Sequence, residues 1–499
     1  MVSVHRPCPV VLQVLSTYAA ITSVACASLI ADLRGQNLTV LAPGDSGYAN
    51  ASAPVNLRFA FQPAAITFPY TTLDVSEILK ITSSHNHQAV ARSGGHSYIA
   101  NGLGGKSGAV VVDMSNFNTV TVDQTTNIAV IGTGNRLGEV ALALNDKGRA
   151  IPHGVCPYVG IGGHSGHGGF GFTARKWGLL LDNIRAMEVV LSNGKVITAS
   201  NSNHPDLFWA LRGASSSFGI VTAIHVDTFA APPSTTVFQY AWDLDPSSAA
   251  SAIAAFQFFV QSPFLPQEFG AEIVLAPGSS PGRLSFGIHG GWYAPPDEFP
   301  AVIAPLLSNL PPPVSANLTV GTYINSVEFL GGLGTLNTTA PDMQAAFYAK
   351  SLMTPEAAPM SNASLNALAN YLATQGFMTS NFWFIEIELY GGVNSAINKV
   401  PLDATSFGHR SSMFTIQFFT ISLNASFPAE GFTLLDGMVD AIVSNNPADW
   451  DYGAYMNYID DRLNNWQRLY FGPHYPKLKV LKALNDPQNT FRFPLSIEE

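Results

Sequence analysis

The chain has 499 residues, of which 47% are hydrophobic and only 12% are charged. This composition supplies a large apolar core and excludes an intrinsically disordered protein. The net charge of −10 and the scarcity of basic runs argue against a nucleic-acid partner.

The N-terminus has the pattern of a secretory signal peptide over residues 1–27. An apolar run follows Arg6 and ends at the small residues Ala25-Cys26-Ala27, which suit a cleavage site. A short membrane anchor is the alternative, although polar residues interrupt the run. No other stretch approaches the roughly 18 unbroken apolar residues that a spanning helix needs. We therefore expect a secreted, extracellular protein with no membrane partner.

The three cysteines are distributed unevenly along the chain. Cys8 and Cys26 lie within the expected signal peptide, so its removal leaves Cys156 alone. In an oxidising compartment, Cys156 is then a buried thiol, an intermolecular bridge or a group committed to other chemistry. Six Asn-x-Ser/Thr sequons indicate a glycoprotein. They begin at Asn37, Asn50, Asn317, Asn337, Asn362 and Asn424.

Helix and strand patterns alternate over residues 58–230. Asp74 and Glu77 are spaced like a capping box at the start of the first predicted helix. Asn193-Gly194 predicts a type I′ turn, because β-branched runs flank it. The other elements expected here are strands at 108–115 and 127–134, a helix at 139–148, a hairpin at 186–200, a helix at 204–213 and a strand near Gly219.

A Pro-rich join at 229–238 predicts a boundary between two lobes. Beyond it, a long strand at 381–392 and a helix near 249–261 are typical of an antiparallel sheet with helices on one face. A C-terminal helix is expected within 475–493, ended by an Asp-Pro pair. The fold class expected from these patterns is α+β.

The glycine-rich stretch "GHGGFG" at 166–171 formally matches the dinucleotide-binding fingerprint. It lacks the strand, turn and helix that a Rossmann site requires, which argues against that site. We interpret the longer run over 160–171 as backbone laid close against a flat or anionic ligand, since glycine permits such an approach.

Several histidines are candidates for chemistry. His153, His164 and His167 lack the spacing of a zinc site, so we expect no metal. His96 follows two glycines in a predicted turn, which can present its ring at a fixed angle. Acid–base work, attachment of a ligand and a packing role all remain open for His96 at this point.

Four stretches of the chain occur together in a characteristic order. They are "RSGGHSY" at 92–98, "HGVCPYVGIGGH" at 153–164, "HPDLFWALRG" at 204–213 and "YMNYIDD" at 455–461. Together they resemble the fungal oligosaccharide oxidases, in the berberine-bridge-enzyme-like branch of the vanillyl-alcohol-oxidase flavoprotein superfamily. This resemblance implies a monomer with a PCMH-type FAD-binding domain at 28–232, a substrate-binding domain at 233–449 and a C-terminal segment at 450–499 that completes the FAD-binding lobe.

The resemblance implies an FAD held by two covalent bonds. His96 would bond the methyl carbon of the flavin's benzenoid ring, and Cys156 the adjacent ring carbon. Such a role would account for a cysteine without a disulfide partner. The further cofactor contacts that the resemblance and the glycine pattern suggest are Arg92, Ser93, Gly94, Gly95, Ser97, Gly160, Gly162, Gly163, His164, Gly168, Ile220 and Val221.

The resemblance also implies the catalytic residues. Tyr458 matches the tyrosine that acts as base, and Glu388 stands where the family has aspartate. A carboxylate cannot lower the pKa of a phenol by its charge, so Glu388 would accept the phenolic proton or orient the ring. Core packing for Tyr458 and a salt bridge on the strand face for Glu388 are the alternatives. The expected substrate contacts are Tyr98, Glu272, Phe384 and Glu386.

Some sugar-binding positions depart from the family. Gly270 stands in place of an arginine, and Phe384 in place of a stacking tryptophan. The favoured function is an oxidase that takes hydride from a hydroxyl-bearing carbon of a carbohydrate and reduces dioxygen to hydrogen peroxide. An oxidase of phenolic or alkaloid-like metabolites is the alternative, and a catalytically silent flavin-bearing binding protein is a third hypothesis.

Overall fold

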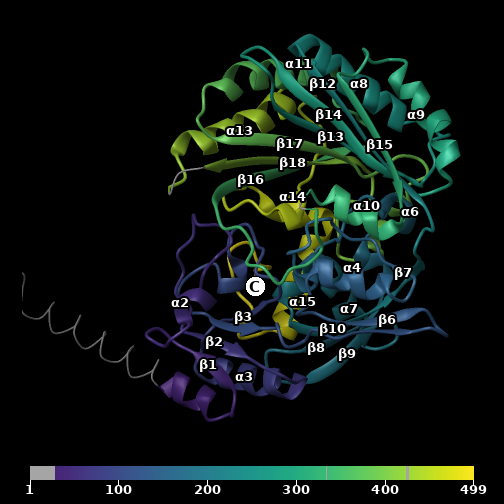
Figure 1. Ribbon diagram of the computed structural model, residues 1–499. Coiled ribbons are helices and arrows are strands. Elements are labelled where there is room, and N and C mark those ends of the chain that lie inside the picture. The colour runs from purple at the N-terminus through teal and green to yellow at the C-terminus, as the bar shows by residue number, and fades with distance from the viewer. Residues whose placement is uncertain (1–27, 333, 423–425, 499) are drawn as a thin grey trace, which may run out of the picture.

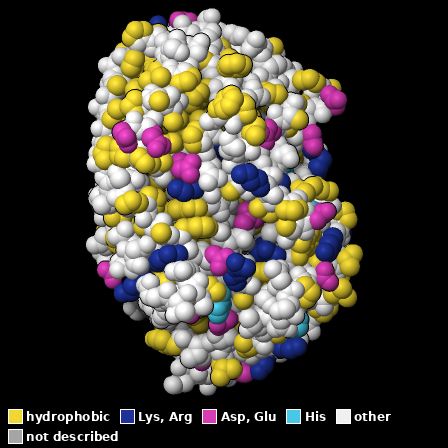
Figure 2. Space-filling view, turned by 90° about the vertical axis from the view of Figure 1, so that its right-hand side faces the viewer, with side chains coloured by type: hydrophobic (Ala, Val, Ile, Leu, Met, Phe, Trp, Pro, Cys, Tyr) yellow, Lys and Arg dark blue, Asp and Glu magenta, His cyan; other side chains and the backbone are white. Residues whose placement is uncertain are grey.

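The computed structural model describes residues 28–332, 334–422 and 426–498. The expected signal peptide at 1–27 and the sequon at Asn424 lie outside the described residues. The described chain forms two lobes stacked one above the other, and its last described residues pack into the lower lobe (Figure 1). On the face drawn in Figure 2, acidic and basic side chains are interspersed and form no continuous basic stripe.

The lower lobe is built on two sheets. The first is mixed, because β4 pairs in parallel with both β2 and β3, whereas β1 pairs with β2 in antiparallel fashion. It has the order β1 (Thr39–Leu41), β2 (Ala65–Phe68), β4 (Val110–Asp113) and β3 (Ala89–Arg92). The second is antiparallel, in the order β5 (Val120–Asp123), β6 (Ile128–Gly132), β10 (Ile220–Asp227), β8 (Ile184–Val190) and β9 (Val196–Ser200).

Short helices and one small ribbon surround these sheets. The ribbon pairs β7 (Arg149–Ala150) with β11 (Phe229–Ala230). The helices are α2 (Tyr48–Ala51), α3 (Thr72–Ser84), α4 (Leu137–Asn145), α5 (Ile161–Gly166), α6 (Ala174–Trp177) and α7 (Pro205–Ala214). The predicted strands, the helix at 139–148 and the helix opened by Pro205 are therefore all present.

Two local predictions were wrong in detail. The capping box of α3 joins Thr71 to Asp74 and excludes Glu77, because the threonine hydroxyl accepts the Asp74 N–H at 3.2 Å. The turn of the β8–β9 hairpin is not type I′, since only Gly194 of the two central residues has a positive φ, of 79°. The Leu191 N–H instead donates to the Lys195 carbonyl oxygen, and the Gly194 N–H donates to that of Leu191, so the loop is longer than two residues.

The upper lobe is one seven-stranded antiparallel sheet with helices. Its order is β15 (Ser315–Gly321), β12 (Thr235–Leu244), β14 (Leu284–Trp292), β13 (Phe269–Pro277), β17 (Phe382–Leu389), β18 (Ser412–Ser422) and β16 (Ala346–Pro355). Its helices are α8 (Pro246–Val260), α9 (Phe299–Leu307), α10 (Tyr323–Leu330), α11 (Asn362–Thr374), α12 (Ala396–Lys399) and α13 (Ala429–Val443). Helices α8, α11 and α13 lie above the sheet, away from the lower lobe (Figure 1).

Alternation along the upper strands decides which groups face the lower lobe. Ile385 and Ile387 of β17 are fully buried in one core with the residues of α8, α11 and α13. Because successive side chains of a strand point to opposite faces, Glu386 and Glu388 lie on the other face. The pattern "IEIEL" therefore places carboxyl groups toward the lower lobe.

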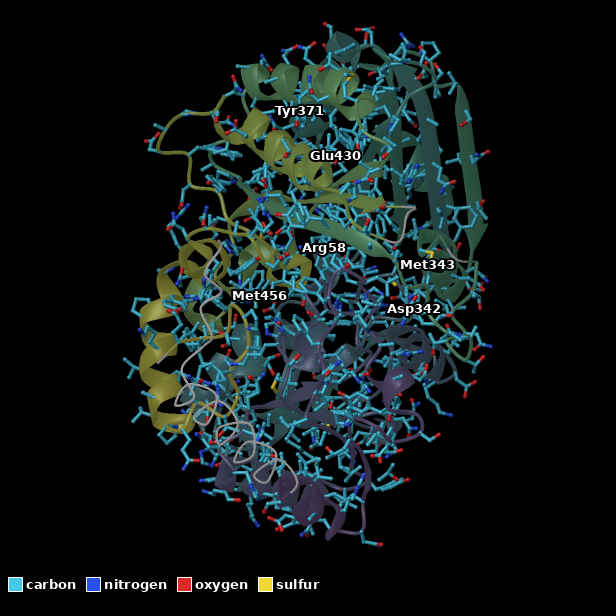
Figure 3. The ribbon with its side chains drawn as sticks, turned by 90° about the vertical axis from the view of Figure 1, so that its left-hand side faces the viewer. Arg58, Asp342, Met343, Tyr371, Glu430 and Met456 are labelled. Atoms are coloured by element: carbon cyan, nitrogen blue, oxygen red, sulfur yellow. The ribbon has the colours of Figure 1, made fainter. Side chains whose placement is uncertain are left out.

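The C-terminal segment returns to the lower lobe after α13. Helices α14 (Trp466–Phe471) and α15 (Tyr475–Asn485) share a core with α7, in which Leu478 and Phe208 are fully buried. Arg58 of the lower lobe contacts the segment at Asp461 at 2.8 Å and lies over the ring of Tyr348 in β16 (Figure 3). The segment thus tethers the two lobes.

A buried ion pair anchors the C-terminal segment. The Nζ of Lys482 lies 2.7 Å from Asp486 Oδ2 and donates to the carbonyl oxygens of Ser217 and Phe491, and both ionic side chains are fully buried. Burying such a pair is tolerated only because each polar atom is satisfied.

Replacing Lys482→Met should lower the free energy of unfolding by about 3–5 kcal/mol, because Asp486 would be left buried without its cation. The measurement is the urea midpoint of the purified protein. Lys80→Ala is the control. It removes an exposed ion pair with Glu77 and should change the free energy of unfolding by less than about 1 kcal/mol. An equally small loss for Lys482→Met would contradict the anchoring role.

Candidate active site

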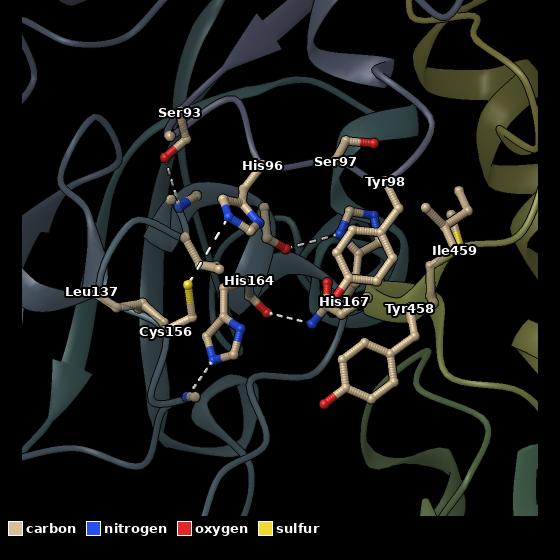
Figure 4. Close-up of a pocket in the computed structure, with 18 of the residues that line it drawn as sticks. Ser93, His96, Ser97, Tyr98, Leu137, Cys156, His164, His167, Tyr458 and Ile459 are labelled. Carbon is tan, nitrogen blue, oxygen red and sulfur yellow. Dashed lines mark hydrogen bonds between the residues drawn. The ribbon is translucent and has the colours of Figure 1, made fainter. Parts of the chain in front are cut away.

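A cavity of about 470 Å³ lies where the polar face of the upper sheet meets loops of the lower lobe. Most of the residues predicted for the site line it. They are Arg92, Ser93, Gly94, Gly95, His96, Ser97, Tyr98, Cys156, Gly160, Gly162, Gly163, His164, Ile220, Val221, Glu272, Glu386, Glu388 and Tyr458. Figure 4 shows several of these side chains around one space.

Two loops meet at one end of the cavity because glycines let their backbones touch. A Cβ added to Gly94 would lie 2.5 Å from the Gly160 nitrogen. A Cβ added to Gly160 would lie 2.0 Å from the Gly94 nitrogen. Contacts this short exclude any side chain at either position. The docked loops place Cys156 Sγ 4.0 Å from His96 Nε2 (Figure 4).

The electrostatics of His96 and Cys156 favour a charged pair. Burial lowers the pKa of His96, but hydrogen bonds and charges from Asp342 and Cys156 outweigh it and raise that pKa to about 9. Burial raises the pKa of Cys156, but the His96 imidazolium outweighs it, so the thiol pKa is lowered. A thiolate is the nucleophilic form of cysteine. The Oδ2 of Asp342 lies 3.2 Å from His96 Nε2 and completes the group.

The residues at this end fit a bound cofactor. The Nδ1 of His96 is buried and has no hydrogen-bond partner among the described residues, which leaves it open to a ligand. A Cβ built on Gly163 would meet nothing within 4 Å, so this backbone faces open space in the cavity wall. An unpartnered ring nitrogen, a thiol whose pKa is lowered and bare glycine backbone are the groups that covalent and close flavin binding would use.

Some predicted cofactor contacts are committed to the protein itself. Arg92 pairs with Asp113, 2.5 Å from its Oδ2, and Ser93 accepts a hydrogen bond from the Gly162 N–H at 3.2 Å. His164 accepts the Gly154 N–H at 3.1 Å (Figure 4). Burial lowers the pKa of His164 to about 3, so its ring is neutral. These side chains shape the cavity wall.

Two predicted site residues do not line the cavity. Gly168 has a φ of 142°, and a Cβ there would lie 2.7 Å from the ring of Tyr455. Its role is to make room for that ring. Phe384 stacks on Phe419 with ring centroids 4.9 Å apart. Phe384 therefore packs against another aromatic side chain and not against the cavity.

Tyr458 and Glu388 meet at the other end of the cavity. The Tyr458 hydroxyl donates a hydrogen bond to Glu388 Oε1 at 3.0 Å. Burial, then the charges of Glu388 and Glu386, raise the pKa of Tyr458 well above its ordinary value. Burial, then the charge of Glu386, raise the pKa of Glu388, which the hydrogen bond from Tyr458 only partly opposes. The phenol is therefore protonated and hydrogen-bonded to a carboxyl of unusually high basicity.

Aromatic neighbours hold Tyr458 in place. The ring of Tyr98 lies parallel to that of Tyr458 with centroids 6.2 Å apart, and Tyr455 meets it edge-on at 5.1 Å. The Gln417 side-chain amide donates to the Tyr98 hydroxyl oxygen at 2.7 Å. These contacts restrict the Tyr458 ring to one orientation.

Sequence reasoning missed three residues of this site. Gln417 is the one amide in the apolar strand "SMFTIQFFTIS", a signal that was available. Tyr455 is the first tyrosine of the "YMNY" motif, and the sequence alone indicates no chemical role for it. Asp342 lies in a loop far along the chain from His96, and nothing in its local sequence signals the contact.

Comparison with known proteins agrees with this geometry. Residues 63–200 match the FAD binding domain family, and residues 454–498 match the berberine and berberine like family. The carbohydrate oxidase of Microdochium nivale is 33% identical over 491 residues, which cover 97% of each chain. The chain belongs to the berberine-bridge-like FAD-linked oxidoreductases.

Solved structures of this family share the whole architecture. A chitooligosaccharide oxidase has a TM-score of 0.88 at 32% identity, covering 95% of this chain and 99% of its own. The glucooligosaccharide oxidase of Acremonium strictum, described with a 6-S-cysteinyl, 8α-N1-histidyl FAD, has a TM-score of 0.87 at 29% identity, covering 94% and 99%. The α+β fold class, the resemblance and the assignment to FAD-dependent oxidoreductases are confirmed. Within the described residues, no helix is long and apolar enough to cross a bilayer.

The docking of the two loops can be tested with a matched pair of glycines. Gly160→Ala should lower the free energy of unfolding by about 2–3 kcal/mol or more, because the new methyl group overlaps the backbone at Gly94. Gly163→Ala, which meets nothing within 4 Å, should change it by less than about 1 kcal/mol. Thermal unfolding of both variants without added flavin is the measurement. Equal stability of the two variants would show that the loops are not docked in this way.

Proposed function

We propose that this protein is a secreted, glycosylated FAD-dependent oxidase that oxidises a hydroxyl-bearing carbon of a carbohydrate and yields hydrogen peroxide. One observation carries the proposal: the Tyr458 hydroxyl bonded to Glu388 in the same cavity as the His96–Cys156 pair. The relatives named above are carbohydrate oxidases, which supports a sugar as the substrate class.

His96 and Cys156 would hold the FAD from two sides. The unpartnered Nδ1 of His96 and the Cys156 sulfur, whose pKa the His96 imidazolium lowers, are the two attachment atoms presented to the cavity at this end, and Nδ1 becomes nucleophilic once His96 loses a proton. Two bonds would fix the isoalloxazine ring without a closed pocket around it. When bound, FAD supplies the acceptor for the hydride and delivers the electrons to dioxygen.

Tyr458 would act as the base for the substrate hydroxyl. Its phenol cannot hold a negative charge at neutral pH, because burial and nearby carboxylates raise its pKa. We infer that Tyr458 accepts the substrate proton as it passes its own proton to Glu388 across the 3.0 Å hydrogen bond. The high basicity of Glu388 suits it to receive that proton. The carbon that loses hydride would then lie beside the Tyr458 hydroxyl.

The proposals of secretion and glycosylation rest on the sequence and on the exposure of the sequon asparagines. The asparagines of five sequons are exposed, as a glycosyltransferase would require, and they are Asn37, Asn50, Asn317, Asn337 and Asn362. The signal peptide at 1–27 supports the same localisation. We propose the monomer as the working form.

Tyr458→Phe should reduce kcat for sugar oxidation about 10²- to 10⁴-fold, since it removes the proton acceptor but keeps the ring. Peroxide release is the measurement, screened over mono- and oligosaccharides, phenolic alcohols and alkaloids, with the flavin absorbance recorded for each variant. Tyr371→Phe, in a helix of the upper lobe distant from the cavity (Figure 3), is the control and should keep full activity.

Each outcome of this screen decides something. Turnover of phenolic or alkaloid substrates alone would replace the carbohydrate proposal with the alternative oxidase. A Tyr458→Phe protein that binds flavin and oxidises sugars at the normal rate would overturn the role of Tyr458. No turnover of any compound by the unaltered holoenzyme would favour a silent flavin-bearing binding protein.

A further inference from the structure

Three carboxyl groups from two adjacent strands gather at the substrate end of the cavity. Glu272 of β13 pairs directly across from Glu388 of β17, and Glu386 lies two residues along β17 on the same face. Directly opposed residues of antiparallel strands have Cβ atoms roughly 5 Å apart. All three side chains line the cavity.

No cation among the described residues pairs with these carboxyl groups. Among the described residues, none of the salt bridges includes Glu272, Glu386 or Glu388. Glu388 is only 9% exposed, and its buried Oε2 has no hydrogen-bond partner in the part of the chain that the structure describes. The neighbouring amide of Gln417 is directed to Tyr98. An unpartnered oxygen of a buried carboxyl group is costly unless a ligand satisfies it.

A metal ion does not fit the cluster. Within the residues that the structure describes, no group of three or more His, Cys, Asp or Glu side chains converges as metal ligands would. An organic ammonium group has a longer reach, because its acceptors lie about 2.8 Å from the nitrogen rather than the roughly 2.0–2.6 Å of metal–oxygen bonds, and it can be held by fewer than three carboxyl groups. A protonated amine is therefore the cation that this spacing suits.

We propose that Glu272, Glu386 and Glu388 form a subsite for a protonated amine, and that the substrate is an amino sugar with a free amine next to the carbon that is oxidised. The inference rests on the proposed function, and it narrows the substrate class. Glu388 contacts Tyr458 at 3.0 Å, so a cation held by the cluster lies close to the reacting hydroxyl. In a 2-amino sugar the amine is on the carbon adjacent to the anomeric carbon.

The protonation of the cluster supports this substrate class. Burial raises the pKa of Glu386 to about 7, and burial with mutual repulsion raises the pKa of Glu272 and Glu388 above their ordinary values. A cation that enters lowers these raised pKa values, so its binding must release protons near pH 7. A neutral sugar held by protonated carboxyl groups would release none. The other titratable groups that line the cavity are Arg92, His96, Tyr98, Cys156, His164, His167, Tyr455 and Tyr458, with Asp342 behind His96. His289 of β14 pairs directly across from Glu272, and burial lowers its pKa, so its ring adds no positive charge at pH 7.

The pH dependence follows from the same shifts. The free carboxyl groups hold protons below their raised pKa values, and those protons compete with the ammonium group. Affinity for the amine should therefore rise as pH increases through about 7, as long as the amine itself stays protonated. The affinity for an uncharged sugar should fall or stay level over the same range.

The test uses the holoenzyme and two ligands that lack the anomeric hydroxyl. They are 2-amino-1,5-anhydro-2-deoxyglucitol and its uncharged counterpart 1,5-anhydroglucitol. Calorimetry at pH 7, in two buffers that differ in ionisation enthalpy, measures affinity and proton release together. We expect the amine to bind on the order of tenfold tighter or more and to release protons, because hydrogen bonds between charged groups are the stronger ones.

A matched pair of variants identifies the groups responsible. Glu386→Gln keeps the shape of the side chain and should reduce the preference for the amine on the order of tenfold, along with the proton release. Glu430→Gln, in the exposed first turn of α13 (Figure 3), should leave both unchanged. The kcat/KM for glucosamine divided by that for N-acetylglucosamine should likewise fall in Glu386→Gln and stay unchanged in Glu430→Gln.

The failures are distinguishable. Tighter binding of the uncharged analogue, or binding of the amine without proton release, would overturn the amine subsite. If neutral sugars still yielded peroxide in that case, the proposed oxidase function would stand. If no sugar yielded peroxide but the amine analogue bound with proton release, the subsite would stand and the oxidase function would fall.

Discussion

The contact between the backbones of Gly94 and Gly160 is the constraint on which the site depends. It brings together two loops that are separated by more than sixty residues of sequence, and no side chain fits at either position. The loops carry His96 and Cys156 to within 4.0 Å of each other. At that distance each group stabilises the charged form of the other, and Asp342 adds to the stabilisation of the His96 imidazolium, so the packing of two glycines contributes to the protonation state of both side chains. The remainder of the fold brings Tyr458 and the carboxyl groups of β13 and β17 to the same cavity.

The second half of the site depends on alternation in the upper sheet. The isoleucines of β17 are buried under helices. Because successive side chains of a strand point to opposite faces, its glutamates face the lower lobe. Tyr458 comes from a third segment, which the buried pair of Lys482 and Asp486 holds in the lower lobe. The Tyr458–Glu388 hydrogen bond therefore crosses from one lobe to the other. A change in how the lobes pack would therefore alter this bond.

Much of this arrangement was predictable from sequence, because it lies in local patterns. The "RSGGHSY" and "HGVCPYVGIGGH" stretches identified His96 and Cys156, and "IEIEL" identified a strand with two carboxyl groups on one face. The structure differs from the sequence-based expectation where a neighbour in space decides the outcome. Gly168 serves the ring of Tyr455 and Phe384 stacks on Phe419, so neither lines the cavity. The contact of Asp342 with His96 joins distant loops and leaves no periodic signal. The hairpin after β8 contained the expected Asn-Gly pair, but its hydrogen bonds close a longer loop.

The central claim is that one flavin is bonded to both docked loops. Tryptic digestion of the holoenzyme followed by mass spectrometry tests it directly. The account predicts a single species in which the peptide containing His96 and the peptide containing Cys156 are joined through one FAD. Recovery of both peptides at their unmodified masses, with FAD released in free form, would contradict it.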